Sequence, residues 1–330
     1  MALYHAVTRF IIPHYIPSHL LSLNAYAMIE PSLHHVSCLD ADGGHRLAYW
    51  QWGRPDSAHV VLCVHGLTRQ GRDFDVLARA LCEQAGGNIR VICPDVVGRG
   101  ESDWLKNPMA YQLPTYAADM LVLLAQLQSE SPIDTLDWLG TSMGGLIGVA
   151  ICGQPGLPLP TPVRRLVLND VGPALEWQAL VRIGAYLGKA GHFASEQEAA
   201  DAMWQISKSF GPHTPEQWLA LSRPMLRRVS EAPNSPWRLH YDPAIAQAFT
   251  LTDEATAQQG EAMLWQLYDG ISAETLVVRG ALSDLLSAQT ATAMTQRGPK
   301  ARVLEFAGVG HAPTFIAQDQ LAAVTAFLLA

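Results

Sequence analysis

The sequence predicts an α/β protein built on a mostly parallel eight-stranded sheet, with helices on both faces and a helical cap insertion. Three observations lead to this fold class. Short apolar runs alternate with longer helical ones along most of the chain, which is typical of parallel strands joined by right-handed helical crossovers. A glycine-rich turn joins the first two apolar runs, and the stretch 172–272 interrupts the alternation.

The expected strands are short and rich in Val, Ile and Leu. The first two, 34–38 and 46–52, flank the turn sequence DADGG and therefore form an antiparallel hairpin at one edge of the sheet. The other strands are expected at 59–66, 88–95, 135–140, 164–170, 275–280 and 301–306. Helices are expected at 74–87, 113–128, 142–153, 287–297 and 317–329.

We predict three segments along the chain. Residues 33–171 and 273–330 form the core, and residues 172–272, which contain no convincing strand, form a helical cap. Residues 1–32 are an N-terminal extension, in which two prolines break the apolar run that a secretory signal or a spanning helix would need. Met28 is the alternative start of the protein.

Composition restricts the class of partner. The chain of 330 residues is 49% hydrophobic, has a formal charge of −8 and contains no basic block, so nucleic acid and anionic membranes are poor candidates. Its five cysteines form no C-x-x-C pair, which favours free thiols in the cytoplasm. We expect a small-molecule substrate and no stable membrane insertion, and self-association into a homo-oligomer stays open.

A candidate nucleophile lies in the stretch LDWLGTSMGGLIG, residues 136–148. Ser142 is the centre of a G-x-S-x-G motif, between an expected strand and an expected helix. A tight strand-to-helix corner needs small neighbours and holds its central side chain out for attack. The alternative is a small residue in a glycine-rich turn. The position in the middle of a parallel sheet favours the nucleophile, because catalysts in such sheets sit at the carboxyl ends of the strands.

A serine hydroxyl needs a base to accept its proton, and that base needs an orienting acid. His311 follows the strand that ends at Phe306, and Asp284 lies four residues past the strand that ends at Gly280. The order Ser, Asp, His is the one expected on this architecture. Asp170 also follows a strand end, so it is the alternative acid.

These motifs give the sequence a family resemblance from about residue 33 to the C-terminus. It resembles the α/β-hydrolase-fold superfamily, and within it the bacterial ester and carbon–carbon-bond hydrolases that carry a helical cap. The matching residues are HG at 65–66, DVVGRGESD at 95–103, GTSMGG at 140–145, the Asp284 loop and GHAP at 310–313. The resemblance implies a Ser142–His311–Asp284 triad, an acyl-enzyme intermediate, no cofactor and no metal. It also implies an oxyanion hole formed by the backbone N–H groups of Leu67 and Met143.

Three arginines suggest the charge of the substrate. Arg69 and Arg72 follow the expected oxyanion loop, and Arg182 lies in the first cap helix. Guanidinium groups bind carboxylates in a bidentate manner, so an acidic substrate such as a hydroxyalkanoate oligomer is one interpretation. The alternative is that these arginines pair with neighbouring aspartates at the surface.

A serine nucleophile implies acyl transfer. We therefore predict a serine hydrolase that acts on a small carboxylic ester, which in one interpretation carries a carboxylate. Three alternatives stay open: a carbon–carbon-bond hydrolase of a meta-cleavage-type diketone acid, a transferase in which an alcohol or thiol replaces water, and a non-catalytic small-ligand-binding relative.

Overall fold

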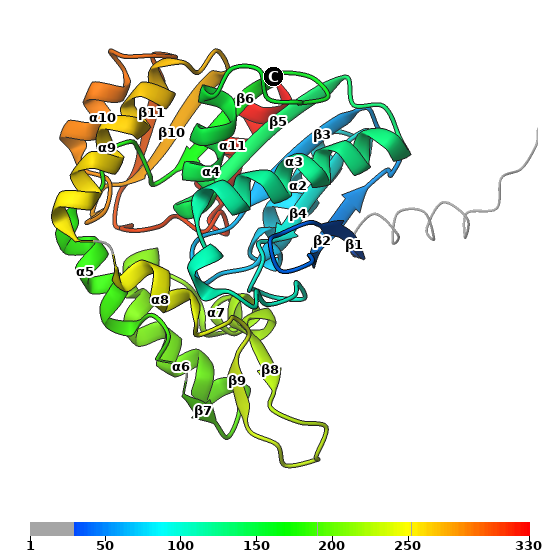
Figure 1. Cartoon of the computed structure of the whole chain (residues 1–330), viewed down its shortest axis with the longest axis vertical. Coiled ribbons are helices and arrows are strands. Elements are labelled where there is room, and N and C mark those ends of the chain that lie inside the picture. Colours follow the sequence, from blue (N-terminus) through cyan, green and yellow to red (C-terminus); the bar gives the residue numbers. More distant parts are fainter. Residues whose placement is uncertain (1–29, 190, 252) are drawn as a thin grey trace, which may run out of the picture.

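The computed structural model describes residues 30–189, 191–251 and 253–330. Most of the predicted N-terminal extension, including the alternative start at Met28, lies outside the described residues. The large sheet has the strand order β1-β2-β4-β3-β5-β6-β10-β11, and Figure 1 shows its strong twist. Its strands are β1 (Ser32–Cys38), β2 (His45–Gly53), β3 (His59–Val64), β4 (Arg90–Asp95), β5 (Thr135–Thr141), β6 (Val163–Asn169), β10 (Glu274–Gly280) and β11 (Arg302–Phe306).

The register confirms the predicted fold class. β1 and β2 form an antiparallel hairpin, in which Cys38 pairs with His45, and β2 is also antiparallel to β4. All other neighbours are parallel. Because parallel strands share one direction, the loops that follow β3, β5, β6, β10 and β11 meet at a single edge of the sheet.

Helices cover both faces of the sheet. One apolar cluster packs α2 (Asp75–Gln84) and α11 (Gln318–Leu329) on one face, and a larger cluster packs four helices on the other. Those four are α3 (Leu113–Glu130), α4 (Met143–Gly153), α9 (Glu254–Asp269) and α10 (Ala288–Met294). The central strand β5 contributes to both clusters, since Trp138 lies in the larger one and Leu139 in the smaller one.

The segment between β6 and β10 projects from one end of the sheet (Figure 1). Besides α9, it contains the α-helices α5 (Trp177–Tyr186), α6 (Glu196–Ser207), α7 (Pro215–Ser222) and α8 (Ile245–Thr250). It also contains a small antiparallel sheet in the order β7-β9-β8, with bounds His192–Phe193, Trp237–Leu239 and Leu226–Arg228. The expectation of a segment without strands is therefore wrong. Strands of two or three residues are too short to show a period of two.

The last helix of this segment, α9, packs against α4 rather than with the other cap helices. Gly153 permits this approach, because a Cβ there would lie 2.1 Å from the carbonyl oxygen of Leu267. The division into a core of residues 33–171 and 273–330 and a cap of residues 172–272 stays a prediction.

Two further expectations concern the compartment. All five cysteines are free, and four of them are buried, as predicted. Within residues 30–189, 191–251 and 253–330, no helix has both the length and the apolar composition needed to cross a membrane.

Candidate active site

Ser142 occupies a strained corner between β5 and α4. Its backbone has φ 52° and ψ −118°, a conformation that non-glycine residues adopt at a cost. The glycines around it are required sterically. A Cβ at Gly140 would lie 2.2 Å from the carbonyl oxygen of Gly144, and one at Gly144 would lie 2.0 Å from that of Val64. The G-x-S-x-G spacing is thus the sequence that permits this turn.

His311 lies in the loop after β11 and contacts Ser142, as predicted. Its Nε2 lies 3.0 Å from Ser142 Oγ. The loop is held from the other side by Ser209 of the cap, whose hydroxyl donates to the carbonyl oxygen of His311 at 2.8 Å. Gly310 N–H in turn donates to the Ser209 carbonyl oxygen at 2.6 Å. Ser209 therefore helps to fix the position of the His311 imidazole.

The carboxylate that contacts His311 is that of Asp170, the alternative acid. Its Oδ2 lies 2.8 Å from His311 Nδ1 and also accepts a hydrogen bond from the Ser283 hydroxyl at 2.6 Å. Its Oδ1 accepts the Gly280 N–H at 2.8 Å. Asp170 follows β6 directly, has φ 55° and is fully buried. The positive φ turns the side chain toward the end of β10.

The structure corrects the prediction of Asp284 as the orienting acid. Its carboxylate pairs with Arg182 of α5, at 2.7 Å from Oδ2 to Nε and 3.0 Å from Oδ1 to Nη2. The carboxylate group is about half exposed, with a relative accessibility of 45%. Four residues past β10, the chain has already turned toward the cap, whereas Asp170 stays at the end of its strand. Arg182, predicted to bind a substrate carboxylate, thus has a carboxylate of the chain itself as its partner.

Of the two predicted oxyanion donors, Met143 follows Ser142 directly in the chain, and Leu67 lines the same cavities as Ser142. None of the hydrogen bonds described for residues 30–189, 191–251 and 253–330 uses either N–H group. The Leu67 loop is held by two buried side chains. Arg99 Nε donates to the Leu67 carbonyl oxygen at 2.8 Å, and His65 Nδ1 donates to that of Gly66 at 2.7 Å.

The protonation of His65 follows from its surroundings. Complete burial lowers its pKa to about 3, so the ring is neutral at pH 7. Its Nε2 can therefore accept the Val96 N–H, at 2.9 Å, while Nδ1–H donates to the Gly66 carbonyl oxygen. These two hydrogen bonds give His65 a structural role beside the Leu67 loop. Arg99 was missed at the sequence level, because a buried loop arginine has no periodic signature.

The other two arginines adopt the alternative arrangement. Arg69 forms a bidentate pair with Asp73, at 2.6 and 2.7 Å. Arg72 does the same with Asp75, at 2.7 Å for both bonds. Both guanidinium groups already pair with a carboxylate three or four residues further along the chain, which argues against the interpretation that they bind a substrate carboxylate.

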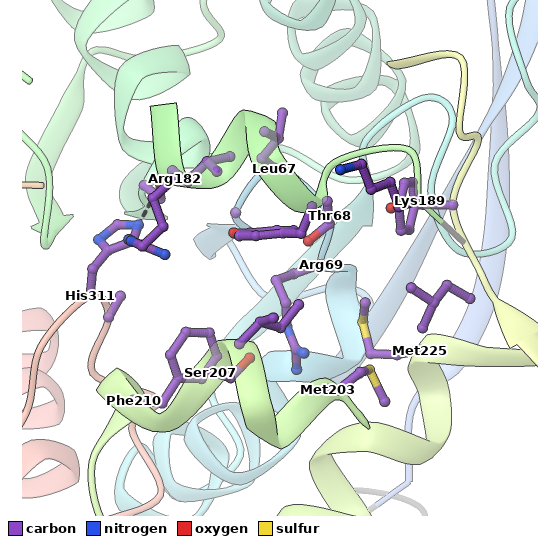
Figure 2. Close-up of a pocket in the computed structure, with 18 of the residues that line it drawn as sticks. Leu67, Thr68, Arg69, Arg182, Lys189, Met203, Ser207, Phe210, Met225 and His311 are labelled. Atoms are coloured by element: carbon purple, nitrogen blue, oxygen red, sulfur yellow. Dashed lines mark hydrogen bonds between the residues drawn. The ribbon is translucent and has the colours of Figure 1, made fainter. Parts of the chain in front are cut away.

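Two cavities open at Ser142. The smaller chamber has a volume of about 300 Å³ and lies between the Leu67 loop, His311 and the helices α5 and α6. Figure 2 shows His311 and Arg182 on one side of this chamber and Lys189 across from them. The larger chamber, of about 790 Å³, lies between Met143, α5, α8 and α9. Leu67, Ser142 and Ile183 line both.

One group of potential metal ligands belongs to the hairpin and α3. The ligand atoms of Cys38, His45 and Asp119 lie within 4.8 Å of one another. His45 contacts Asp40 through Nδ1 at 2.8 Å and Asp119 through Nε2 at 3.1 Å. Burial lowers the pKa of His45, but hydrogen bonds to Asp119, Cys38 and Asp40 outweigh it and raise the pKa to about 11. The group is therefore an ion-pair cluster with a protonated histidine.

The eight-stranded sheet, together with the strained corner at Ser142 and the histidine that contacts it, is typical of the alpha/beta hydrolase fold. Residues 61–324 match the alpha/beta hydrolase family, and the chain belongs to that family and is a hydrolase. A 3-hydroxybutyrate-oligomer hydrolase from Cupriavidus necator is 46% identical over 298 residues, which cover 90% of this chain and 98% of that protein.

Solved structures agree with this assignment. An alpha/beta hydrolase from Novosphingobium aromaticivorans is 32% identical and superimposes with a TM-score of 0.75, covering 91% of this chain and 98% of that one. A putative hydrolase from Rickettsia typhi is 25% identical with a TM-score of 0.77, covering 90% and 99%.

Proposed function

We propose that this protein hydrolyses carboxylic esters through an acyl-enzyme intermediate on Ser142, with His311 as the base and Asp170 as the acid that orients it. The observation that carries the proposal is the hydrogen-bonded chain of these three side chains, with 3.0 Å from Ser142 Oγ to His311 Nε2 and 2.8 Å from His311 Nδ1 to Asp170 Oδ2. This is the arrangement that activates a serine hydroxyl.

The reaction proceeds in two halves. Ser142 Oγ attacks the ester carbonyl carbon while its proton passes to His311 Nε2, and a tetrahedral intermediate forms. When the intermediate collapses, the ester C–O bond breaks, His311 gives its proton to the departing alkoxide, and the acyl group stays on Ser142. Water then attacks the acyl-enzyme with His311 as base again. The carboxylic acid leaves and the Ser142 hydroxyl is restored.

The negative charge of the tetrahedral intermediate needs preorganised donors. We propose the N–H groups of Leu67 and Met143, which have no other partner among the described residues. Arg99 and neutral His65 hold the Leu67 loop through carbonyl oxygens, so the donors need no reorganisation during the reaction. Their apolar side chains are compatible with this role, because only the backbone acts.

The substrate class follows from the relative of known activity. A protein 46% identical over 90% of this chain hydrolyses 3-hydroxybutyrate oligomers. We propose the same class of substrate here, a short linear ester of 3-hydroxybutyrate that ends in a carboxylate. The free cysteines support a cytoplasmic location. No specific observation favours carbon–carbon-bond cleavage of a diketone acid, a reaction that would use the same three residues.

The test is steady-state hydrolysis of 3-hydroxybutyrate dimer and p-nitrophenyl butyrate by the wild type and Ser142→Ala. Both activities are expected in the wild type, with a loss of about 10⁴-fold or more in the variant. Ser129→Ala, which removes an exposed hydroxyl on α3, is the matched control and keeps full activity. Turnover of a diketone acid without turnover of esters would replace the proposal, as would activity that survives in folded Ser142→Ala.

A further inference from the structure

The two chambers at Ser142 differ in the catalytic groups that they contain. His311 lines the smaller chamber, and Met143 lines the larger one. In ester cleavage the histidine must hand its proton to the oxygen of the departing alcohol. The alcohol part of the substrate therefore occupies the chamber on the His311 side, and the acyl part occupies the other.

The chambers also differ in charge. Three cations, Arg69, Arg182 and Lys189, line the smaller chamber, and no carboxylate does among the residues the structure describes there. In the larger chamber the described lining includes three glutamates, Glu176, Glu254 and Glu261, and no lysine or arginine. An anionic group is thus favoured in the smaller chamber and disfavoured in the larger one.

The three cations of the smaller chamber are not equivalent. Arg69 is neutralised by Asp73 and Arg182 by Asp284. For the ammonium group of Lys189, which follows α5, the described part of the chain offers no hydrogen bond or ion pair. Lys189 lies on the far side of the chamber from His311 (Figure 2). A ligand anion held there would be separated from the reacting carbon by the width of the chamber.

We propose that the smaller chamber is a carboxylate-binding leaving-group site, in which Lys189 binds the terminal carboxylate of the ester substrate. This inference rests on the proposed ester hydrolysis and adds a direction to it. In an oligomer of 3-hydroxybutyrate, the unit with the free carboxylate is the alcohol part of the last ester bond. The smaller chamber receives that unit, and the larger chamber receives the rest of the chain as the acyl group.

Two consequences follow for the product sequence. The enzyme removes units from the carboxylate end, so free 3-hydroxybutyrate is the first product from every oligomer. The larger chamber, about 790 Å³ against about 300 Å³, accommodates acyl groups of more than one unit. Blocking the hydroxyl end of a trimer therefore leaves cleavage intact, whereas methylating its carboxylate weakens binding.

The experiment compares the 3-hydroxybutyrate trimer with its methyl ester as substrates for the wild type, Lys189→Met, Lys189→Arg and Lys208→Met. The readout is the ratio of kcat/KM for the free acid to kcat/KM for the methyl ester. Loss of a charge-assisted hydrogen bond lowers this ratio by about 10–100-fold in Lys189→Met, mainly through KM. Lys189→Arg keeps most of the ratio. Lys208→Met, an exposed cap residue outside the chamber, keeps all of it.

The outcomes separate the two proposals. Equal ratios in the wild type and Lys189→Met, with both trimers cleaved, would overturn the carboxylate site and leave ester hydrolysis standing. A trimer labelled in its hydroxyl-end unit tests the direction of cleavage as well: the proposal expects the label in the dimer, and labelled monomer with unlabelled dimer as the initial products would overturn it. If the wild type cleaved neither trimer nor p-nitrophenyl butyrate, the proposed function itself would fail.

Discussion

The choice between Asp170 and Asp284 gives the sharpest test of the site, because each is changed to asparagine with almost no change in volume. Asparagine tolerates the positive φ of 55° at position 170, so the corner should fold in both variants. The effect on activity is then a matter of hydrogen bonding.

At position 170 the introduced amide has one orientation that fits. Its oxygen must stay on the Gly280 N–H, now bonded to Oδ1 at 2.8 Å, because an NH₂ group cannot accept that bond. The NH₂ group then replaces Oδ2 and donates to His311 Nδ1. This places the histidine proton on Nε2, where it cannot accept the Ser142 proton. A wrong tautomer of this kind costs about 10⁴-fold in kcat.

At position 284 the change removes a partly exposed ion pair with Arg182, in which the two side chains are 38% and 45% accessible. Such pairs contribute about 1 kcal/mol or less, so kcat changes by less than about fivefold. The assay is p-nitrophenyl butyrate hydrolysis, with thermal unfolding as the check on folding. A loss of about 10⁴-fold in Asp284→Asn, with Asp170→Asn nearly active, would refute the assignment of the acid.

Three further predictions concern the surroundings of the site. Arg69→Ala and Arg72→Ala change kcat/KM for a carboxylate-bearing ester and for its methyl ester by the same factor, since both arginines are already paired; a selective loss on the charged ester would contradict this. Gly144→Ala lowers the free energy of unfolding in urea by about 3 kcal/mol, because the added Cβ would lie 2.0 Å from a carbonyl oxygen of β3. The control is Gly260→Ala, which is not destabilising because nothing lies within 4 Å of its added Cβ. The buried His65 has a pKa of about 3, against 6.5 for an exposed histidine, so the wild type loses free energy of unfolding as the pH falls below 6.5. The difference in free energy of unfolding between the wild type and His65→Gln therefore shrinks by about 2 kcal/mol from pH 7 to pH 5. A difference that does not depend on pH would show that His65 is not held neutral.

The sequence was sufficient to predict the order along the chain of the strands in the large sheet and two of the three residues in the hydrogen-bonded chain. Ser142 and His311 follow strands whose carboxyl ends must meet. Ser142 has a glycine two positions away on each side, and His311 lies between Gly310 and Ala312. The choice of acid needed three-dimensional information. Asp170 and Asp284 both follow strands. The positive φ of Asp170 directs its side chain to His311, whereas Asp284 pairs with Arg182, 102 positions away in the chain.

Other features depend on contacts that no local pattern encodes. The small sheet of β7, β9 and β8 has strands too short to be detected from periodicity. Arg99 holds the Leu67 loop through a hydrogen bond between residues 32 positions apart. The ammonium group of Lys189 has no partner within the part of the chain that the structure describes, and a sequence cannot show this, because any exposed lysine looks the same in it.

The most direct test of the central claim is covalent labelling by a fluorophosphonate, read by intact mass and peptide mapping. We expect one adduct per chain on Ser142, no adduct in Ser142→Ala, and strongly slowed labelling in Asp170→Asn. A folded wild type that takes up no label, or an adduct on any other residue, would contradict the claim that Ser142 is activated by His311.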